Sequence, residues 1–122
     1  IGVVAILTGS VQAFIASGLT GGENVIGDNP IAPTTESIER GQTTYLQFCA
    51  TCHGESTRGD GPLAPGLDPP PADLVIHIPI HPDNVLFLLI QEGIPGTSMP
   101  PLGTAISDEE KWHLVNYLRT IK

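Results

Sequence analysis

The sequence has few positive charges and few residues of several informative kinds. Its 122 residues include five Lys and Arg against 13 Asp and Glu, so the formal net charge is −8 at pH 7. Binding to nucleic acid requires clustered Lys and Arg for the phosphates, and this charge balance excludes that class of protein. There is also a single Met, and there are only two Cys. A structural zinc site commonly takes four ligands from two Cys or His pairs, so two cysteines are too few for the usual all-cysteine site.

Both cysteines fall in one short motif. Residues 49–53 read C-A-T-C-H, the C-x-x-C-H pattern typical of c-type haem attachment. Thiols at this spacing can form thioether bonds with the two vinyl groups on one edge of a porphyrin. His53 then lies under the ring, where its imidazole can bind the iron. We therefore predict one haem c, bound covalently through Cys49 and Cys52, with His53 as the proximal ligand.

The single methionine is the candidate for the second iron ligand. Met99 lies in the loop sequence T-S-M-P-P, where prolines restrict the backbone. A thioether is a soft, neutral ligand that favours ferrous iron, so a His and Met pair raises the reduction potential. We predict His53 and Met99 as the two metal ligands.

Other interpretations of the cysteine motif are weaker. Two further histidines have more than one possible role. A redox dithiol needs a thioredoxin-like βαβ setting, and no such strands flank the motif. A disulfide across two residues would close too short a loop to stabilise much. His77 and His81 have a possible metal spacing, but prolines interrupt their segment. They could be exposed loop residues, hydrogen-bond donors to a haem propionate, or rival iron ligands.

The first part of the chain contains no charged side chain. Residues 1–19 are mostly apolar and approach the length of about 20 residues that spans a bilayer. Small residues recur there every four positions, a pattern that lets helices approach closely in lipid: Ala5, Gly9, Ala13 and Ser17. We expect a transmembrane anchor at 1–19; the alternatives are a lipid-facing anchor without partners or the apolar region of a signal peptide. Residues 20–36, rich in Gly and Pro, are expected to form an extended linker.

The remaining residues, 37–122, contain signals for helices. A helix is expected over 37–49, with Thr34 or Thr35 as its N-cap. A second is expected to begin with Pro82 at its first position and to end with Gly93 as its C-cap. Ser107 and Glu110 form a capping box before the last helix. Six prolines between 64 and 82 predict an ordered loop, or a polyproline II stretch around 69–71.

In this order of elements and motifs, residues 37–122 resemble a class I c-type cytochrome. The resemblance implies an all-α fold of three to four helices around a covalently bound haem, here preceded by a single transmembrane helix. It implies that the carbonyl of Pro62 accepts a hydrogen bond from His53 Nδ1, and that Leu63 packs on the ring. It also implies that the first and last helices cross, a contact that Gly41, Tyr45 and Tyr117 suit. The implied cofactor-binding residues are Cys49, Cys52, His53, Pro62, Leu63 and Met99.

The expected function is one-electron transfer without catalysis of a substrate reaction. Redox proteins would be the partners, in a respiratory or photosynthetic complex such as a quinol-oxidising complex, alternative complex III or a terminal oxidase. Because bacteria attach haem c outside the cytoplasm, we expect the haem domain on the periplasmic side of the bacterial inner membrane. The alternatives are a haem enzyme or ligand sensor with an open or His-ligated sixth position, and a purely structural haem subunit.

Overall fold

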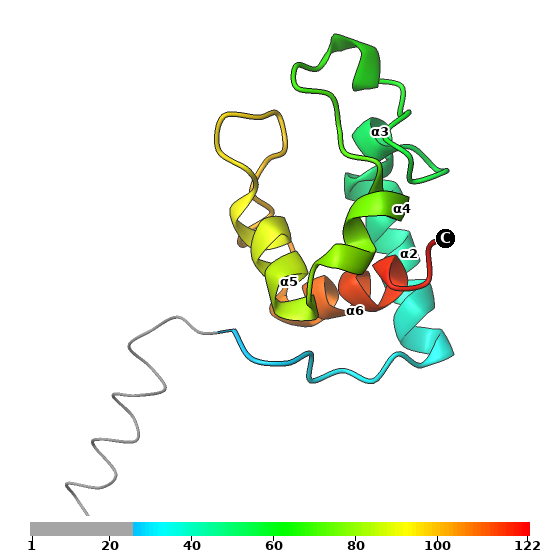
Figure 1. Cartoon of the computed structure of the whole chain (residues 1–122). Helices are drawn as coiled ribbons and strands as arrows, with labels where there is room; N and C mark the ends of the chain where they lie inside the picture. Colours follow the sequence, from blue (N-terminus) through cyan, green and yellow to red (C-terminus); the bar gives the residue numbers. More distant parts are fainter. Residues whose placement is uncertain (1–25) are drawn as a thin grey trace, which may run out of the picture.

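The computed structural model describes residues 26–122 (Figure 1). Five α-helices and two 3₁₀ helices make up this part of the chain, and it contains no β-strand: α2 (Thr35–Phe48), α3 (Ala50–His53), η1 (Ala64–Gly66), α4 (Leu74–His77), η2 (Ile78–Ile80), α5 (Asp83–Glu92) and α6 (Asp108–Leu118). The all-α prediction is confirmed for these residues. Over 26–122, no helix is long and apolar enough to cross a membrane. The transmembrane helix expected at 1–19 lies outside the described residues.

The helix ends follow the capping signals of the sequence. The Thr34 hydroxyl accepts a hydrogen bond from the Ser37 amide at 3.1 Å, and α2 therefore begins two residues earlier than expected. Ser107 Oγ accepts from the Glu110 amide at 3.1 Å and starts α6. Gly93 ends α5 at φ +66°, where a Cβ would approach the backbone of residues 99–101. This glycine closes the loop after α5 against the helix.

Helices α2 and α6 pack against each other through a glycine and two tyrosines. A Cβ on Gly41 would overlap the carbonyl group of His113 and lie 2.8 Å from Cβ of Tyr117. The rings of Tyr45 and Tyr117 contact each other at 5.3 Å between centroids. The contact predicted for Gly41, Tyr45 and Tyr117 is confirmed. Tyr45 is fully buried there, together with Leu114 of α6.

The proline-rich segment 64–82 is more regular than a loop. It contains η1, α4 and η2, and the Asp73 side chain caps α4 by accepting from the Val75 amide at 3.0 Å. Arg119, at the end of α6, donates to the carbonyl oxygens of Ile78 and His81 and pairs with Asp83. The ordered loop expected here thus contains three short helical turns, and contacts from a distant helix end hold the last of them.

Residues 26–33, which we call the strap, precede α2 without forming a helix or strand and run along the edge of the molecule below α5 and α6 in Figure 1. Asn29 donates to Asn116 Oδ1 at 2.8 Å, and Asn116 donates to the Ile31 carbonyl at 3.0 Å. Asn84 donates to the Ile26 carbonyl at 3.2 Å. The side chains of Ile26 and Ile31 pack on the core. This part of the segment expected to be a linker therefore lies against the domain.

Candidate cofactor site

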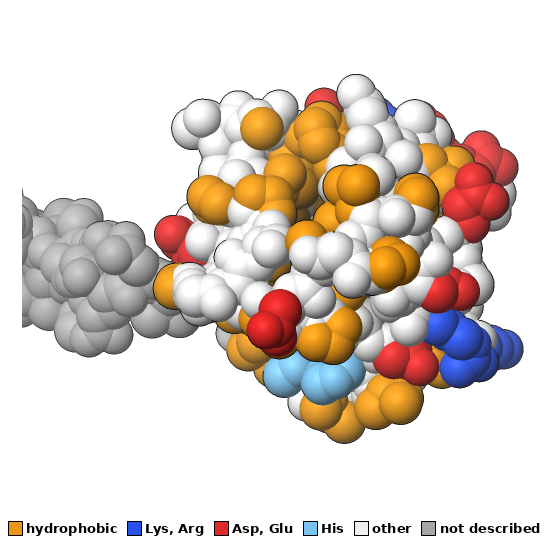
Figure 2. Space-filling model, turned by 90° about the horizontal axis from the view of Figure 1, so that it is seen from above, with side chains coloured by type: hydrophobic (Ala, Val, Ile, Leu, Met, Phe, Trp, Pro, Cys, Tyr) orange, Lys and Arg blue, Asp and Glu red, His pale blue; other side chains and the backbone are white. Residues whose placement is uncertain are grey.

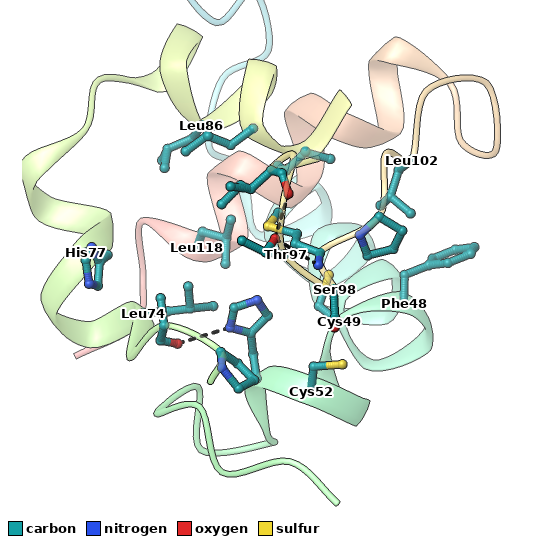
Figure 3. A pocket seen from close by; sticks show the side chains of 18 of the residues that line it. Phe48, Cys49, Cys52, Leu74, His77, Leu86, Thr97, Ser98, Leu102 and Leu118 are labelled. Atoms are coloured by element: carbon teal, nitrogen blue, oxygen red, sulfur yellow. Dashed lines mark hydrogen bonds between the residues drawn. The ribbon is translucent and has the colours of Figure 1, made fainter. Parts of the chain in front are cut away.

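An apolar cavity of about 360 Å³ lies between α3, α4, α5 and the loop after α5 (Figure 3). None of the residues that line it is Asp, Glu, Lys or Arg. Figure 2 shows many hydrophobic side chains on the face turned toward the viewer. The cavity brings together Cys49, Cys52, His53 and Met99, the residues for which the sequence predicts haem attachment and iron ligation.

Helix α3 positions both cysteines and the histidine. It begins directly after Cys49 and ends at His53, where Gly54 takes φ +84°. A Cβ at Gly54 would overlap the Asp60 carboxylate, so this turn requires glycine. The Tyr45 hydroxyl donates to the Gly54 carbonyl at 2.6 Å and ties the end of α3 to α2. The motif therefore sits on a short helix that is fixed at its C-terminal end.

The imidazole of His53 is held in one orientation. Its Nδ1 lies 3.1 Å from the carbonyl oxygen of Ala72. A carbonyl only accepts, so Nδ1 carries the proton and Nε2 keeps a free lone pair for a metal. Burial lowers the pKa of His53, while the hydrogen bond to Ala72 opposes this shift. Both the tautomer and the neutral charge suit an iron ligand.

The structure does not show the hydrogen bond that the resemblance implies between Pro62 and His53, and it places Leu63 outside the cavity. Neither residue lines the cavity, and Leu63 is 55% exposed. The backbone here turns back onto α3 instead: the Gly61 amide donates to the Cys52 carbonyl at 3.0 Å, and the Leu63 amide donates to the Thr51 carbonyl at 3.0 Å. These bonds satisfy carbonyl groups that the short helix leaves free, and they turn the loop away from the imidazole.

Ala72 takes the role that the resemblance assigned to Pro62. It follows Pro69, Pro70 and Pro71, and all four residues line the cavity. Prolines have no backbone N–H, so this stretch offers acceptors and few donors. The run of prolines was the available signal, but many prolines lie between 62 and 82, and the sequence alone does not single out the one that precedes the acceptor.

Met99 lies in a loop that is held by its own hydrogen bonds. Its amide donates to Thr97 Oγ1 at 3.2 Å, and its carbonyl accepts from the Ile94 amide at 3.2 Å. The Leu102 amide donates to the Ile90 carbonyl at 3.0 Å and joins the loop to α5. These bonds place Met99 in the cavity wall, in a loop of restricted conformation.

The two cysteines are free thiols that are partly buried in the cavity wall. Burial raises the pKa of the Cys49 thiol to about 12, and the neighbouring Cys52 adds to the shift. Cys49 is therefore protonated at neutral pH in the folded chain without its cofactor.

The arrangement fits a haem better than a metal held by protein side chains alone. Within residues 26–122, no three His, Cys, Asp or Glu side chains come close enough to hold a metal ion together. A haem supplies four nitrogen ligands of its own and needs only axial ligands from the protein. The uncharged, apolar cavity and the orientation of His53 suit its porphyrin ring.

A protein family model described as cytochrome c oxidase, cbb3-type, subunit III matches residues 36–118. The chain belongs to this family and is a class I c-type cytochrome. It is therefore an electron-transfer haem protein, and its haem c is covalently bound.

Solved structures agree with the cytochrome fold. The cytochrome is 28% identical to a chain of the reducing HAO-like protein complex of Kuenenia stuttgartiensis, with a TM-score of 0.66 over 86% of its own residues. It spans about half of that longer chain, of which 54% is covered. Cytochrome cL from the marine methylotroph Methylophaga aminisulfidivorans is 22% identical, with a TM-score of 0.57; the match covers 87% of this chain and 66% of that one and shows a shared fold. No curated protein matches the chain.

Proposed function

We propose that this cytochrome is a one-electron carrier with a single haem c, attached through Cys49 and Cys52 and bound axially by His53 and Met99. One observation carries the proposal: all four side chains line the same cavity, whose wall contains no Asp, Glu, Lys or Arg. The hydrogen bond to Ala72 agrees with it, because it leaves Nε2 of His53 available to the iron. The carrier would not catalyse a substrate reaction.

The chain's own residues favour fast electron exchange. The bound haem supplies an iron that changes between the ferrous and ferric states. The Ala72 carbonyl fixes the His53 ring, and the contacts of Thr97 and Ile94 fix the loop of Met99. Ligands that are already in place need little rearrangement when the charge changes. The apolar wall keeps water from the ring, which favours the less charged, ferrous site.

We further propose that residues 1–19 anchor the cytochrome in the bacterial inner membrane, with residues 37–122 on the periplasmic side as a haem domain. Its partners would be redox proteins of a membrane complex. The absence of charge over residues 1–22 and the family's description as an oxidase subunit support this assignment. So does the similar chain in a protein complex.

The ligation is tested by replacing Met99 with Ala. A weak absorption band at the red end of the ferric visible spectrum reports bonding between Met and iron. We expect the band in the native protein, and its loss in Met99→Ala together with new binding of carbon monoxide. The midpoint potential should fall by on the order of 0.1 V, within the ~0.8 V range that axial ligands span.

Ser98→Ala is the matched control, because Ser98 lines the same cavity wall beside Met99. Its band and potential should stay near the native values. A native protein that lacks the band and binds carbon monoxide would instead indicate an open site, as in a haem enzyme or sensor. An unchanged potential in Met99→Ala would show that another residue binds the iron.

A further inference from the structure

Two histidines outside the proposed ligand set belong to the same cavity. His77 and His81 both line it, and their rings stack with centroids 6.5 Å apart and planes 15° apart. Figure 3 shows His77 on one side of the cavity and Cys49 and Cys52 on the other. The histidine pair therefore lies on the wall opposite the attachment motif.

The arrangement of substituents on a haem relates this wall to the haem carboxylates. The two vinyl groups of the porphyrin lie on one edge, and its two propionate carboxylates lie on the opposite edge. If Cys49 and Cys52 hold the vinyl edge, the carboxylates point toward the wall that carries His77 and His81. Carboxylates that leave water need hydrogen-bond donors or positive charges nearby.

No arginine or lysine is available from the cavity wall for this task. Charged groups on the segments that flank this wall pair with one another: Arg119 binds Asp83 and the carbonyl groups of Ile78 and His81, and Arg58 pairs with Asp73. Arg119 thereby holds the backbone of the segment that carries the histidines. The imidazoles of His77 and His81 are the protonatable side chains on this wall.

We propose that His77 and His81 face the haem carboxylates and take up a proton when the haem is reduced. This inference rests on the proposed function. In the reduction step, a one-electron donor protein gives an electron to ferric iron, and a proton from solvent binds one imidazole nitrogen of the pair. On oxidation, the electron and the proton leave again. Added negative charge in an apolar cavity stabilises the imidazolium, so electron and proton binding favour each other.

The experiment is an equilibrium redox titration of the haem-loaded protein between about pH 5 and 8, the range in which histidines commonly titrate. The midpoint potential of the native protein should fall as pH rises, by a total of about tenfold in the reduction equilibrium, or about 59 mV for one electron. The double variant His77→Gln/His81→Gln should lose most of this dependence. A native potential that does not change with pH would overturn the inference.

Ile76→Gln and Ile80→Gln are matched controls. These side chains lie on the same segment, are 63% and 67% exposed, and do not line the cavity. Both should keep the native pH dependence, which separates loss of the imidazoles from a general change in the segment. Equal pH dependence in the double histidine variant and in the native protein would contradict the role of the pair.

Two further measurements distinguish failure of this inference from failure of the proposed function. The ferric band of Met ligation is recorded for each variant: its absence from native protein defeats the proposed ligation, whereas its presence with an unaltered pH dependence in the histidine variant defeats only this inference. If the double variant does not retain haem, NMR of the native histidine ring protons decides. The rings should titrate at higher pH in the ferrous than in the ferric protein; identical titration in both states would overturn the inference.

Discussion

At the residue scale, the proximal histidine is fixed by groups that never touch the iron. The Ala72 carbonyl sets the tautomer of His53, and the Tyr45 hydroxyl holds the carbonyl of Gly54, the next residue in the chain. Tyr45 is fully buried. Burial is the main cause that raises its pKa, and the nearby Cys49 adds to the shift. Tyr45 thus acts as a neutral donor that secures the end of α3.

Replacing Tyr45 with Phe should lower the free energy of unfolding by about 1 kcal/mol at pH 7. The cost is small for a buried bond because the Gly54 carbonyl also accepts from the Thr57 amide at 3.1 Å. The folded-state pKa of Tyr45 is raised, so its stabilising contribution is complete below about pH 10 and is lost as pH rises further. The difference between native and variant should therefore shrink in strongly alkaline solution. Denaturant unfolding at pH 7 and about pH 11 measures both values.

Tyr117→Phe serves as the control. Within residues 26–122 its hydroxyl makes no hydrogen bond to another side chain or backbone group, so the loss at pH 7 should be smaller. Equal losses in the two variants would show that the bond from Tyr45 to Gly54 contributes little.

The residues of the site were predictable to different degrees. The positions of Cys49, Cys52 and His53 follow from one local motif, and Met99 is the single residue of its type. The acceptor for His53 was not predictable, because it depends on how the backbone between 54 and 72 folds. Hydrogen bonds of Gly61 and Leu63 to α3 decide this path, and sequence spacing does not reveal them.

At the scale of the elements, the contact between α2 and α6 depends on the absence of a side chain at Gly41. Glycine costs about 1 kcal/mol relative to alanine inside a helix. Here the missing Cβ lets the backbone of α6 approach at His113, so that Tyr45 and Tyr117 can pack beside the contact. The packing gain outweighs the loss of helix propensity.

Gly41→Ala should therefore destabilise the domain in spite of the better helix former. Overpacking of a close contact typically costs about 1–3 kcal/mol, and the group that must move here is backbone. Gly66→Ala is the matched control, because a Cβ there meets no atom within 4 Å. We expect that variant to be neutral or slightly more stable. Thermal unfolding of both variants measures the difference, and a stabilised Gly41→Ala would refute the close contact.

The sequence predicted helices well where their signals were local. The hydroxyl caps at Thr34 and Ser107 and the glycine at Gly93 each act within one turn of their helix. The turns of α4 and η2 were missed because Arg119 holds them from a distant part of the chain. A pattern of prolines gives no sign of such a partner.

At the scale of the whole molecule, the strap connects the start of α2 with α5 and α6. Asn116 is 4% exposed, and its amide group bonds to Asn29, Ile31 and Ser37. Without the strap, part of this buried amide would lose its partners, and core side chains next to Ile26 and Ile31 would meet water. The strap therefore contributes to the stability of the haem domain.

Two truncations test this division of the chain. Removing residues 1–22 keeps the strap, so we expect a folded cytochrome with native spectrum and native unfolding midpoint. Removing residues 1–33 takes the strap away and should lower the free energy of unfolding by about 2–4 kcal/mol, from lost hydrogen bonds and lost apolar burial. Equal stability of the two products would show that the strap contributes nothing. If residues 1–19 form the proposed anchor, both products should be released from membranes, and a membrane-bound product would count against that proposal.

The protonated thiol of Cys49 affects how fast the chain can oxidise before its haem is attached. Disulfide formation proceeds through attack by a thiolate, so its rate depends on the small fraction of deprotonated sulfur. With the pKa of Cys49 near 12, only about one molecule in 10⁵ carries that thiolate at pH 7. Air oxidation that starts from Cys49 is correspondingly slow once the domain has folded. Burial in the cavity wall thus slows disulfide formation that begins at this sulfur while the chain lacks its haem.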